Sequence, residues 1–211
     1  MPVCKHAIVA FCNRHKQFFL NPSMLSIRNL RFGYGERPVF CDYSAEIPAR
    51  AVCIAPNGAG KTTLLRIVAG IATPESGTVL VGGTADYCAS VLLSDDLLLP
   101  HVSLARQFSW ISSETGLSRD DLRRALEPFR LAPYLDRRPH ELSQGERQWA
   151  TIAFVCAMPA DIYLLDEPMR FLDADRTRVF FEYLADRPQM RCILTAHAFP
   201  AGCPLAEWRL F

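Results

Sequence analysis

A glycine-rich loop is the first segment of the chain whose residue types could do chemistry. Residues 55–63 read Ala-Pro-Asn-Gly-Ala-Gly-Lys-Thr-Thr, after a short apolar run at 51–54 and before apolar residues at helical spacing up to residue 70. The backbone N–H groups of such a loop can point into one concavity, because glycine adopts the positive φ angles that this requires. An apolar strand, a glycine-rich loop and a helix in this order predict a site for phosphate groups.

Side chains at the end of the loop add the groups that a bound nucleotide needs. Lys61 is predicted to reach the β- and γ-phosphates, and the Thr62 hydroxyl to bind Mg²⁺. The positions that need positive φ fall on Gly58 and Gly60. The residues predicted to bind the nucleotide are Asn57, Gly58, Ala59, Gly60, Lys61, Thr62 and Thr63. Ala55 stands where the usual pattern begins with Gly, a change that a negative φ at this position would allow.

A second segment ends an apolar strand with two carboxylates. Residues 162–165 (Ile-Tyr-Leu-Leu) are typical of a buried parallel strand, and Asp166 and Glu167 follow at its carboxyl end. Ligands collect at this end of the strands in open α/β sheets. We therefore predict that Asp166 binds Mg²⁺ through a water molecule and that Glu167 is the general base that polarises an attacking water. The alternative is a pair of ordinary exposed acids at a strand end.

A third segment, residues 142–146, lies between these two in the chain and reads Leu-Ser-Gln-Gly-Glu. Ser143 is a favourable helix N-cap, and the N-terminus of the following helix is a second site for anions. The three segments in this order resemble the nucleotide-binding subunit of an ATP-binding cassette (ABC) transporter. In that family the segment docks on the γ-phosphate held by the other subunit, which implies nucleotide contacts for Ser143 and Gly145. The family usually has Leu-Ser-Gly-Gly-Gln, so Gln144 and Glu146 depart from it, and a capped helix without a ligand is the alternative.

The same resemblance implies roles for two further side chains. His197 follows a strand-like run at 191–196 and resembles the switch histidine, which contacts the γ-phosphate and orients the water. Tyr34 resembles the aromatic residue that stacks on adenine, although Phe32 or Phe40 could serve instead. The predicted catalytic residues are Lys61, Glu167 and His197.

Ser94 is the position that departs most from the family. The resemblance places it where the family has a glutamine that contacts Mg²⁺ and the water and relays the nucleotide state to the membrane partner. Serine is shorter and reaches Mg²⁺ only through water. We therefore expect a different coupling, a substitution of this role by Asp95, or slow hydrolysis.

The fold that the resemblance implies is α/β, with a P-loop NTPase core, an antiparallel edge sheet and an inserted helical subdomain. The resemblance covers residues 24–211, with the helical subdomain at about 100–157. Residues 1–23 are expected to be an extension that is disordered or not translated. The local patterns predict a hairpin near 33–37, an edge strand at 78–81 and helices at about 102–113, 118–129 and 143–157.

Composition excludes several classes of protein. The 211 residues fit one domain, and half of them are hydrophobic. The net charge of +1 gives no electrostatic case for binding nucleic acid. No run of 18 apolar residues occurs, so no transmembrane helix is predicted and a membrane path would need another chain. The eight scattered cysteines lack a Cys-x-x-Cys pair and are expected to be free thiols in the reducing cytoplasm.

Together these features imply an ATP-binding and ATP-hydrolysing subunit of an ABC transporter, with ATP and Mg²⁺ as cofactors. Such subunits form head-to-tail dimers on the cytoplasmic face of the membrane and drive an integral membrane permease. The compact length is similar to that of the small heme-exporter ATPases of cytochrome c biogenesis. Two alternatives stay open: a soluble ABC ATPase that assists assembly, for example of iron–sulfur clusters, and a degenerate cassette that binds ATP and acts structurally in a heterodimer.

Overall fold

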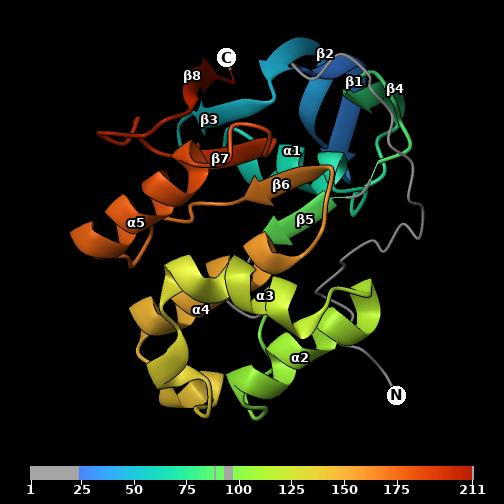
Figure 1. Ribbon diagram of the computed structural model, residues 1–211. Helices are drawn as coiled ribbons and strands as arrows, with labels where there is room; N and C mark the ends of the chain where they lie inside the picture. The colour runs from blue at the N-terminus through green and yellow to red at the C-terminus, as the bar shows by residue number, and fades with distance from the viewer. Residues whose placement is uncertain (1–23, 88, 93–96, 211) are drawn as a thin grey trace. The chain divides into compact units, whose positions relative to one another are not determined.

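A computed structural model describes three stretches of the chain, which are residues 24–87, 89–92 and 97–210. These residues belong to two compact units, one α/β and one helical (Figure 1). The extension predicted for residues 1–23 lies outside the described residues. The same holds for Ser94 and Asp95, so the expectations for these positions stay predictions.

The α/β unit comprises the described chain up to Leu92, Ala160–Glu167 and the chain from Gln189 onward. Its five-stranded sheet has the order β5-β6-β7-β3-β8, and every adjacent pair is parallel (Figure 1). The strands are β3 (Arg50–Ile54), β5 (Ala89–Leu92), β6 (Ile162–Leu165), β7 (Cys192–Ala196) and β8 (Ala206–Arg209). Strands β3, β6 and β7 are almost wholly buried, as their continuous apolar runs require. The predicted α/β fold with a parallel core is confirmed.

An antiparallel sheet with the order β2-β1-β4 belongs to the same unit. Strands β1 (Met24–Tyr34) and β2 (Arg37–Pro48) are joined by a tight turn, so the hairpin predicted near 33–37 is confirmed. Strand β4 (Ser76–Val81) pairs with β1 at the edge of the sheet, as predicted. Apolar side chains of this sheet share one buried core with helix α1 (Lys61–Val68), which follows the glycine-rich loop.

The helical unit comprises the described chain from Leu97 to Pro159 together with Pro168–Pro188. Its helices are α2 (Leu104–Thr115), α3 (Arg119–Leu126), α4 (Gln144–Ala157) and α5 (Ala174–Ala185), with 3₁₀ turns at Glu127–Phe129, Ala132–Tyr134 and Pro139–Glu141. Ser118 caps α3 by accepting a hydrogen bond from the Asp121 amide, as its sequence position predicts. Helix α3 ends before the expected residue 129, because Pro128 has no N–H to continue the i→i−4 ladder and the chain turns into 3₁₀ geometry.

Aromatic side chains form the centre of the helical unit. Trp149 on α4 is 4% exposed, and its indole Nε1 donates a hydrogen bond to the Phe129 carbonyl at 2.8 Å. The Phe129 ring centroid lies 5.0 Å from that of Trp149 and 4.8 Å from that of Tyr183 on α5. Buried rings with a satisfied indole N–H therefore join α4, α5 and the turn after α3.

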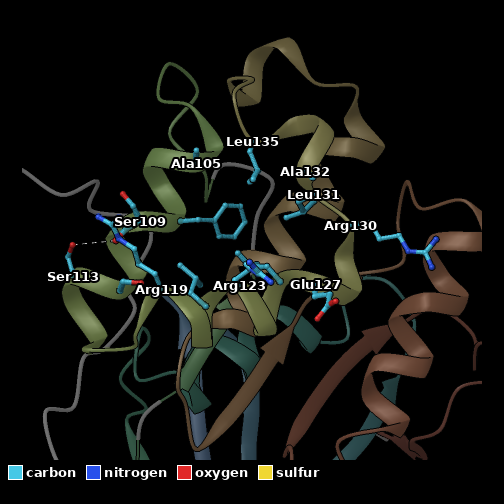
Figure 2. Close-up of a pocket in the computed structure, with 14 residues that line it drawn as sticks. Ala105, Ser109, Ser113, Arg119, Arg123, Glu127, Arg130, Leu131, Ala132 and Leu135 are labelled. Atoms are coloured by element: carbon cyan, nitrogen blue, oxygen red, sulfur yellow. Dashed lines mark hydrogen bonds between the residues drawn. The ribbon is translucent and has the colours of Figure 1, made fainter.

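A pocket of about 620 Å³ also lies in the helical unit, lined by α2, α3 and the turns after α3 (Figure 2). Its lining combines apolar side chains such as Phe108 and Leu122 with the positive charges of Arg119 and Arg123. None of the residues predicted to bind nucleotide lines this pocket. It is therefore distinct from the glycine-rich loop at residues 55–60, which is called the phosphate loop below.

Two buried thiols of the α/β unit predict a loss of stability at alkaline pH. Cys53 on β3 and Cys192 on β7 are free thiols, as expected, and burial raises the pKa of each to about 12. Near Cys53 this burial outweighs the opposing charge of Lys61. A thiol in the unfolded chain ionises near pH ~8.5, so above that pH the folded state holds protons that the unfolded state has lost. The free energy of unfolding therefore falls between about pH 9 and pH 12.

We expect a lower Tm at pH 10 than at pH 8, measured by circular dichroism at constant ionic strength. The Cys53→Ala, Cys192→Ala double variant should show a smaller difference between the two Tm values, because these two thiols no longer contribute to it. An equal difference in the wild type and the double variant would assign the pH dependence to other groups.

Candidate functional site

The phosphate loop leads from β3 into α1 with glycine at the two positions that have a left-handed backbone. Gly58 has φ +77° and Gly60, the N-cap residue of α1, has φ +98°. A Cβ atom at Gly60 would also lie 2.9 Å from Val39 Cγ1, so glycine is required there on both grounds. Helix α1 has no side-chain cap and no acidic residue in its first turn. Its first N–H groups and the positive end of its dipole therefore suit an anion.

Lys61 lies along the inside of this loop. The residue is 6% exposed, and Nζ donates hydrogen bonds to the carbonyls of Ala55 at 2.7 Å and Pro56 at 3.3 Å. An ammonium group has three donors, so one N–H is left for a phosphate oxygen. Ala55 is not among the residues with positive φ, which is the condition under which the departure from Gly is tolerated.

Two hydroxyls from different elements hold the Asp166 carboxylate. Thr62 Oγ1, on the first turn of α1, donates to Oδ2 at 2.5 Å, and Thr195 Oγ1, on β7, donates to Oδ1 at 2.5 Å. The fold thus brings together Thr62 and Asp166, the two residues predicted to bind Mg²⁺. Mg²⁺ takes oxygen ligands and combines one or two carboxylates with phosphate oxygens and water, so this donor set fits a magnesium nucleotide. The described stretches hold no group of three or more His, Cys, Asp or Glu side chains suited to a metal, so this site depends on a hydroxyl and one carboxylate.

Glu167 and His197 meet beside this carboxylate. The Nε2 atom of His197 lies 2.9 Å from Glu167 Oε1. Glu167 has φ +47°, an uncommon backbone conformation for a residue with a Cβ, and its amide donates to Thr195 Oγ1 at 2.9 Å. The Glu167 side chain is 27% exposed, so water can reach the carboxylate. A carboxylate held by a histidine and open to water is the arrangement that a general base needs.

Among the three aromatic candidates for adenine, exposure favours Tyr34. Tyr34 is 49% exposed, whereas Phe32 and Phe40 are buried in the core, so among the three only Tyr34 is open to a ligand. The Tyr34 hydroxyl lies 3.4 Å from Thr63 Oγ1 on α1, and this hydrogen bond is the main cause that lowers the pKa of Tyr34. Stacking of adenine on Tyr34 stays a prediction.

Ser143 begins helix α4 with a complete capping box. Its Oγ accepts a hydrogen bond from the Glu146 amide at 3.3 Å, and Glu146 Oε2 accepts one from the Ser143 amide at 2.8 Å. The bond from the Ser143 amide holds the pKa of Glu146 below its usual range. Glu146 thus serves as the N3 residue of the capping box, a role that glutamine, the usual residue of the family here, also fills.

Gly145 is required by a close backbone approach within the helical unit. A Cβ atom there would lie 2.6 Å from the Phe171 carbonyl oxygen, closer than any side chain tolerates. Phe171 itself has φ +69°, and the following Asp173 caps α5 through the Arg176 amide. Ser143 and Gly145 belong to the helical unit and the phosphate loop to the α/β unit.

Thr195 is the residue at this site that the sequence did not single out. In isolation it is one more threonine in an apolar strand. The parallel pairing of β6 with β7 places Leu165 opposite Leu194, and the next position on each strand is Asp166 and Thr195. A register prediction for these two strands would have found the contact, but the residue type alone carries no such signal.

Comparison with known proteins identifies the family. The family model described as ABC transporter matches residues 48–170. The maltose/maltodextrin import ATP-binding protein MalK of Yersinia pestis is 33% identical in an alignment of 190 residues that covers 82% of this chain and 52% of MalK. The sn-glycerol-3-phosphate import ATP-binding protein UgpC of Ruegeria pomeroyi is 31% identical in an alignment of 163 residues that covers 71% of this chain and 46% of UgpC. The chain belongs to the ABC transporter family, in the class of its ATP-binding proteins.

Solved structures share the fold. A protein from Pyrococcus furiosus, described as an ABC transporter ATP-binding protein, superposes with a TM-score of 0.73 at 25% identity, covering 89% of this chain and 98% of that one. The chain spans about half the length of the curated relatives it matches, between 44% and 53%. Within the described residues, no helix is both long and apolar enough to cross a bilayer.

Proposed function

We propose that this chain binds Mg-ATP at the phosphate loop, hydrolyses it, and powers the movement of a substrate through a separate membrane subunit. The observation that carries the proposal is the contact between Glu167 Oε1 and His197 Nε2 at 2.9 Å, one residue from Asp166. Asp166 in turn contacts Thr62 at the start of α1. A base, its orienting histidine and a magnesium site therefore come from the ends of β6 and β7 and the start of α1.

Phosphoryl transfer is catalysed by positioning and electrostatics, and each described group has a matching role. Lys61 and the first N–H groups of α1 donate to phosphate oxygens and stabilise their charge. Glu167 accepts the proton of the attacking water, and His197 holds the Glu167 carboxylate in place. Mg²⁺, when bound near Thr62 and Asp166, neutralises charge on the phosphate oxygens.

A second subunit would complete the nucleotide site. The capping box of α4 uses the N–H groups of Ser143 and Glu146, and the N–H groups of Gln144 and Gly145 lie in the same first turn. The N–H groups of Gln144 and Gly145 can donate to the γ-phosphate held by another copy of the chain or by a related subunit. The negative charge of Glu146 is partly offset by Arg137, whose Nη1 lies 3.7 Å from Oε2. A head-to-tail dimer is therefore part of the proposal.

The relatives support a transporter role over the alternatives. MalK, UgpC and the molybdenum import ATP-binding protein ModC are all named as ATP-binding proteins of importers. By this likeness the chain would act on the cytoplasmic face of the membrane with an integral membrane permease as its partner. The contact between Glu167 and His197 and the hydrogen bond from Thr62 to Asp166 argue for turnover rather than a degenerate cassette.

Hydrolysis of ATP by the purified chain tests the proposal, with Lys61→Ala as the matched blank. Loss of the ammonium removes a charge-assisted hydrogen bond to phosphate, and we expect nucleotide affinity to fall about 10- to 100-fold. Release of inorganic phosphate is measured at several ATP concentrations with Mg²⁺ present. Turnover in the wild type that disappears in the variant supports the proposal. A wild-type protein that neither binds nor hydrolyses ATP would refute the proposal.

A further inference from the structure

Thr195 contacts two residues of the site although it is not itself predicted to bind the nucleotide. It is fully buried, with 0% of its surface exposed, near the carboxyl end of β7. Its hydroxyl donates one hydrogen bond to Asp166 Oδ1 at 2.5 Å and accepts one from the Glu167 amide at 2.9 Å. One side chain therefore contacts both the proposed magnesium residue and the backbone of the proposed base.

The sheet order explains how a single hydroxyl reaches both groups. Strand β7 lies between β6, which ends at Leu165 before the two carboxylates, and β3, which leads into the phosphate loop. Cys53 on β3 pairs with Thr195, and Leu165 on β6 pairs with the preceding Leu194. Thr195 is thus the residue of β7 that lies level with the ends of β6 and β3, where the carboxylates and the phosphate loop follow.

The two hydrogen bonds that Asp166 accepts, from Thr62 and from Thr195, are expected to change differently when the metal binds. Thr62 is a predicted magnesium ligand, so its contact with Oδ2 has to be remade around the ion. The Thr195 hydroxyl is not a predicted ligand and can keep its bond to Oδ1 throughout. It is therefore the contact that fixes the rotation of the carboxylate. The bond from the Glu167 amide also helps to hold the φ of +47° at that residue.

We propose that Thr195 is a positioning residue for Mg-dependent hydrolysis: its hydroxyl orients the Asp166 carboxylate toward the metal and secures the backbone that presents Glu167 to water. This inference rests on the proposed function. It predicts that the hydroxyl, and not the methyl group or the bulk of the side chain, sets the magnesium dependence.

Four substitutions separate the hydroxyl from packing. Thr195→Val keeps the shape and removes the hydroxyl, Thr195→Ala removes hydroxyl and methyl together, and Thr195→Ser keeps the hydroxyl. Thr151→Val is the matched control, because Thr151 is also 0% exposed and its hydroxyl donates to the Arg147 carbonyl at 2.8 Å, within α4 of the helical unit. If Thr195→Val does not fold, Thr195→Ala takes its place in every measurement.

Each variant is assayed in two ways. The first is ATP hydrolysis against Mg²⁺ concentration, and the second is the affinity for a fluorescent ATP analogue with Mg²⁺ and with EDTA. For Thr195→Val we expect the half-saturating Mg²⁺ concentration to rise and turnover to fall, each by about 10- to 100-fold, the size expected for a hydrogen bond to a charged group. Affinity in EDTA should stay within about two-fold, since that binding depends on the phosphate loop. Thr195→Ser and Thr151→Val should match the wild type.

Three results would overturn the inference. One is a Thr195→Val protein with the magnesium dependence and turnover of the wild type. Another is an equal loss in Thr195→Ser, which keeps the hydroxyl and would therefore assign the effect to altered packing at this position. The last is an equal loss of affinity with and without Mg²⁺, which would mean a general disruption of the fold. The wild type alone decides the proposed function, since it either binds and hydrolyses ATP or does not, whereas only the variants decide the role of Thr195.

Discussion

Glu167→Gln is expected to abolish turnover while leaving Mg-ATP bound, and the ATP-bound protein should accumulate as a dimer. A general base contributes typically about 10²- to 10⁴-fold to a rate, and an amide cannot accept the proton of the attacking water at neutral pH. Gln has the size of Glu and the same backbone preference, so the left-handed conformation at φ +47° is no more strained in the variant. The phosphate loop and Thr62 are unchanged, and binding should persist.

Phosphate release measures the loss of turnover, and size-exclusion chromatography with and without Mg-ATP measures the accumulation of the dimer. Glu182→Gln is the control, because Glu182 is an exposed residue of α5 that pairs with Arg178 on the surface. It should keep wild-type turnover and elution. Retained turnover in Glu167→Gln would remove Glu167 from the role of base. A monomer in saturating ATP would instead speak against the proposed dimer and the roles of Ser143 and Gly145.

Trp149→Ala is expected to lower the free energy of unfolding by about 3–5 kcal/mol, the usual cost of emptying a buried tryptophan site. Trp149 is 4% exposed, and its ring packs against that of Phe129. Its removal also leaves the Phe129 carbonyl without the indole hydrogen bond. For a chain of this length, each kcal/mol shifts the Tm by about 2–4 °C, so the Tm should fall by about 10 °C.

Trp110→Ala is the matched control in the same helical unit. Trp110 on α2 is 36% exposed, and a surface substitution of this kind usually changes stability by no more than about 0.5 kcal/mol. Thermal melts of both variants followed by circular dichroism decide the comparison. Equal Tm losses in the two variants would contradict the view that the cluster of Trp149, Phe129 and Tyr183 holds this unit together. Trp149→Phe should lie between, because it keeps a ring and loses the hydrogen bond.

The features predicted correctly from the sequence are those set by neighbours in the chain. The glycines of the phosphate loop follow from the positive φ that the turn needs, and the helix caps at Ser118 and Ser143 follow from hydroxyl groups next to unsatisfied N–H donors. The apolar runs before Asp166 and around the β7 strand predicted a buried parallel core. These signals act over a few residues and need no knowledge of the rest of the fold.

Only the tertiary structure decided which residues of distant segments touch. The contact of Thr195 with Asp166 depends on the register of two strands that are separated in the chain by α5, and a one-residue slip would send that side chain to the other face. Gly145 looked like a phosphate-binding glycine, and its close approach to the Phe171 carbonyl emerged only from the packing of the helical unit. Tyr34, Phe32 and Phe40 were equivalent as residue types until burial separated them. The sequence by itself therefore determined the class of site and its chemistry, because these depend on local backbone geometry and residue type. The structure decided how the site is held together, because that depends on pairings between residues far apart in the chain.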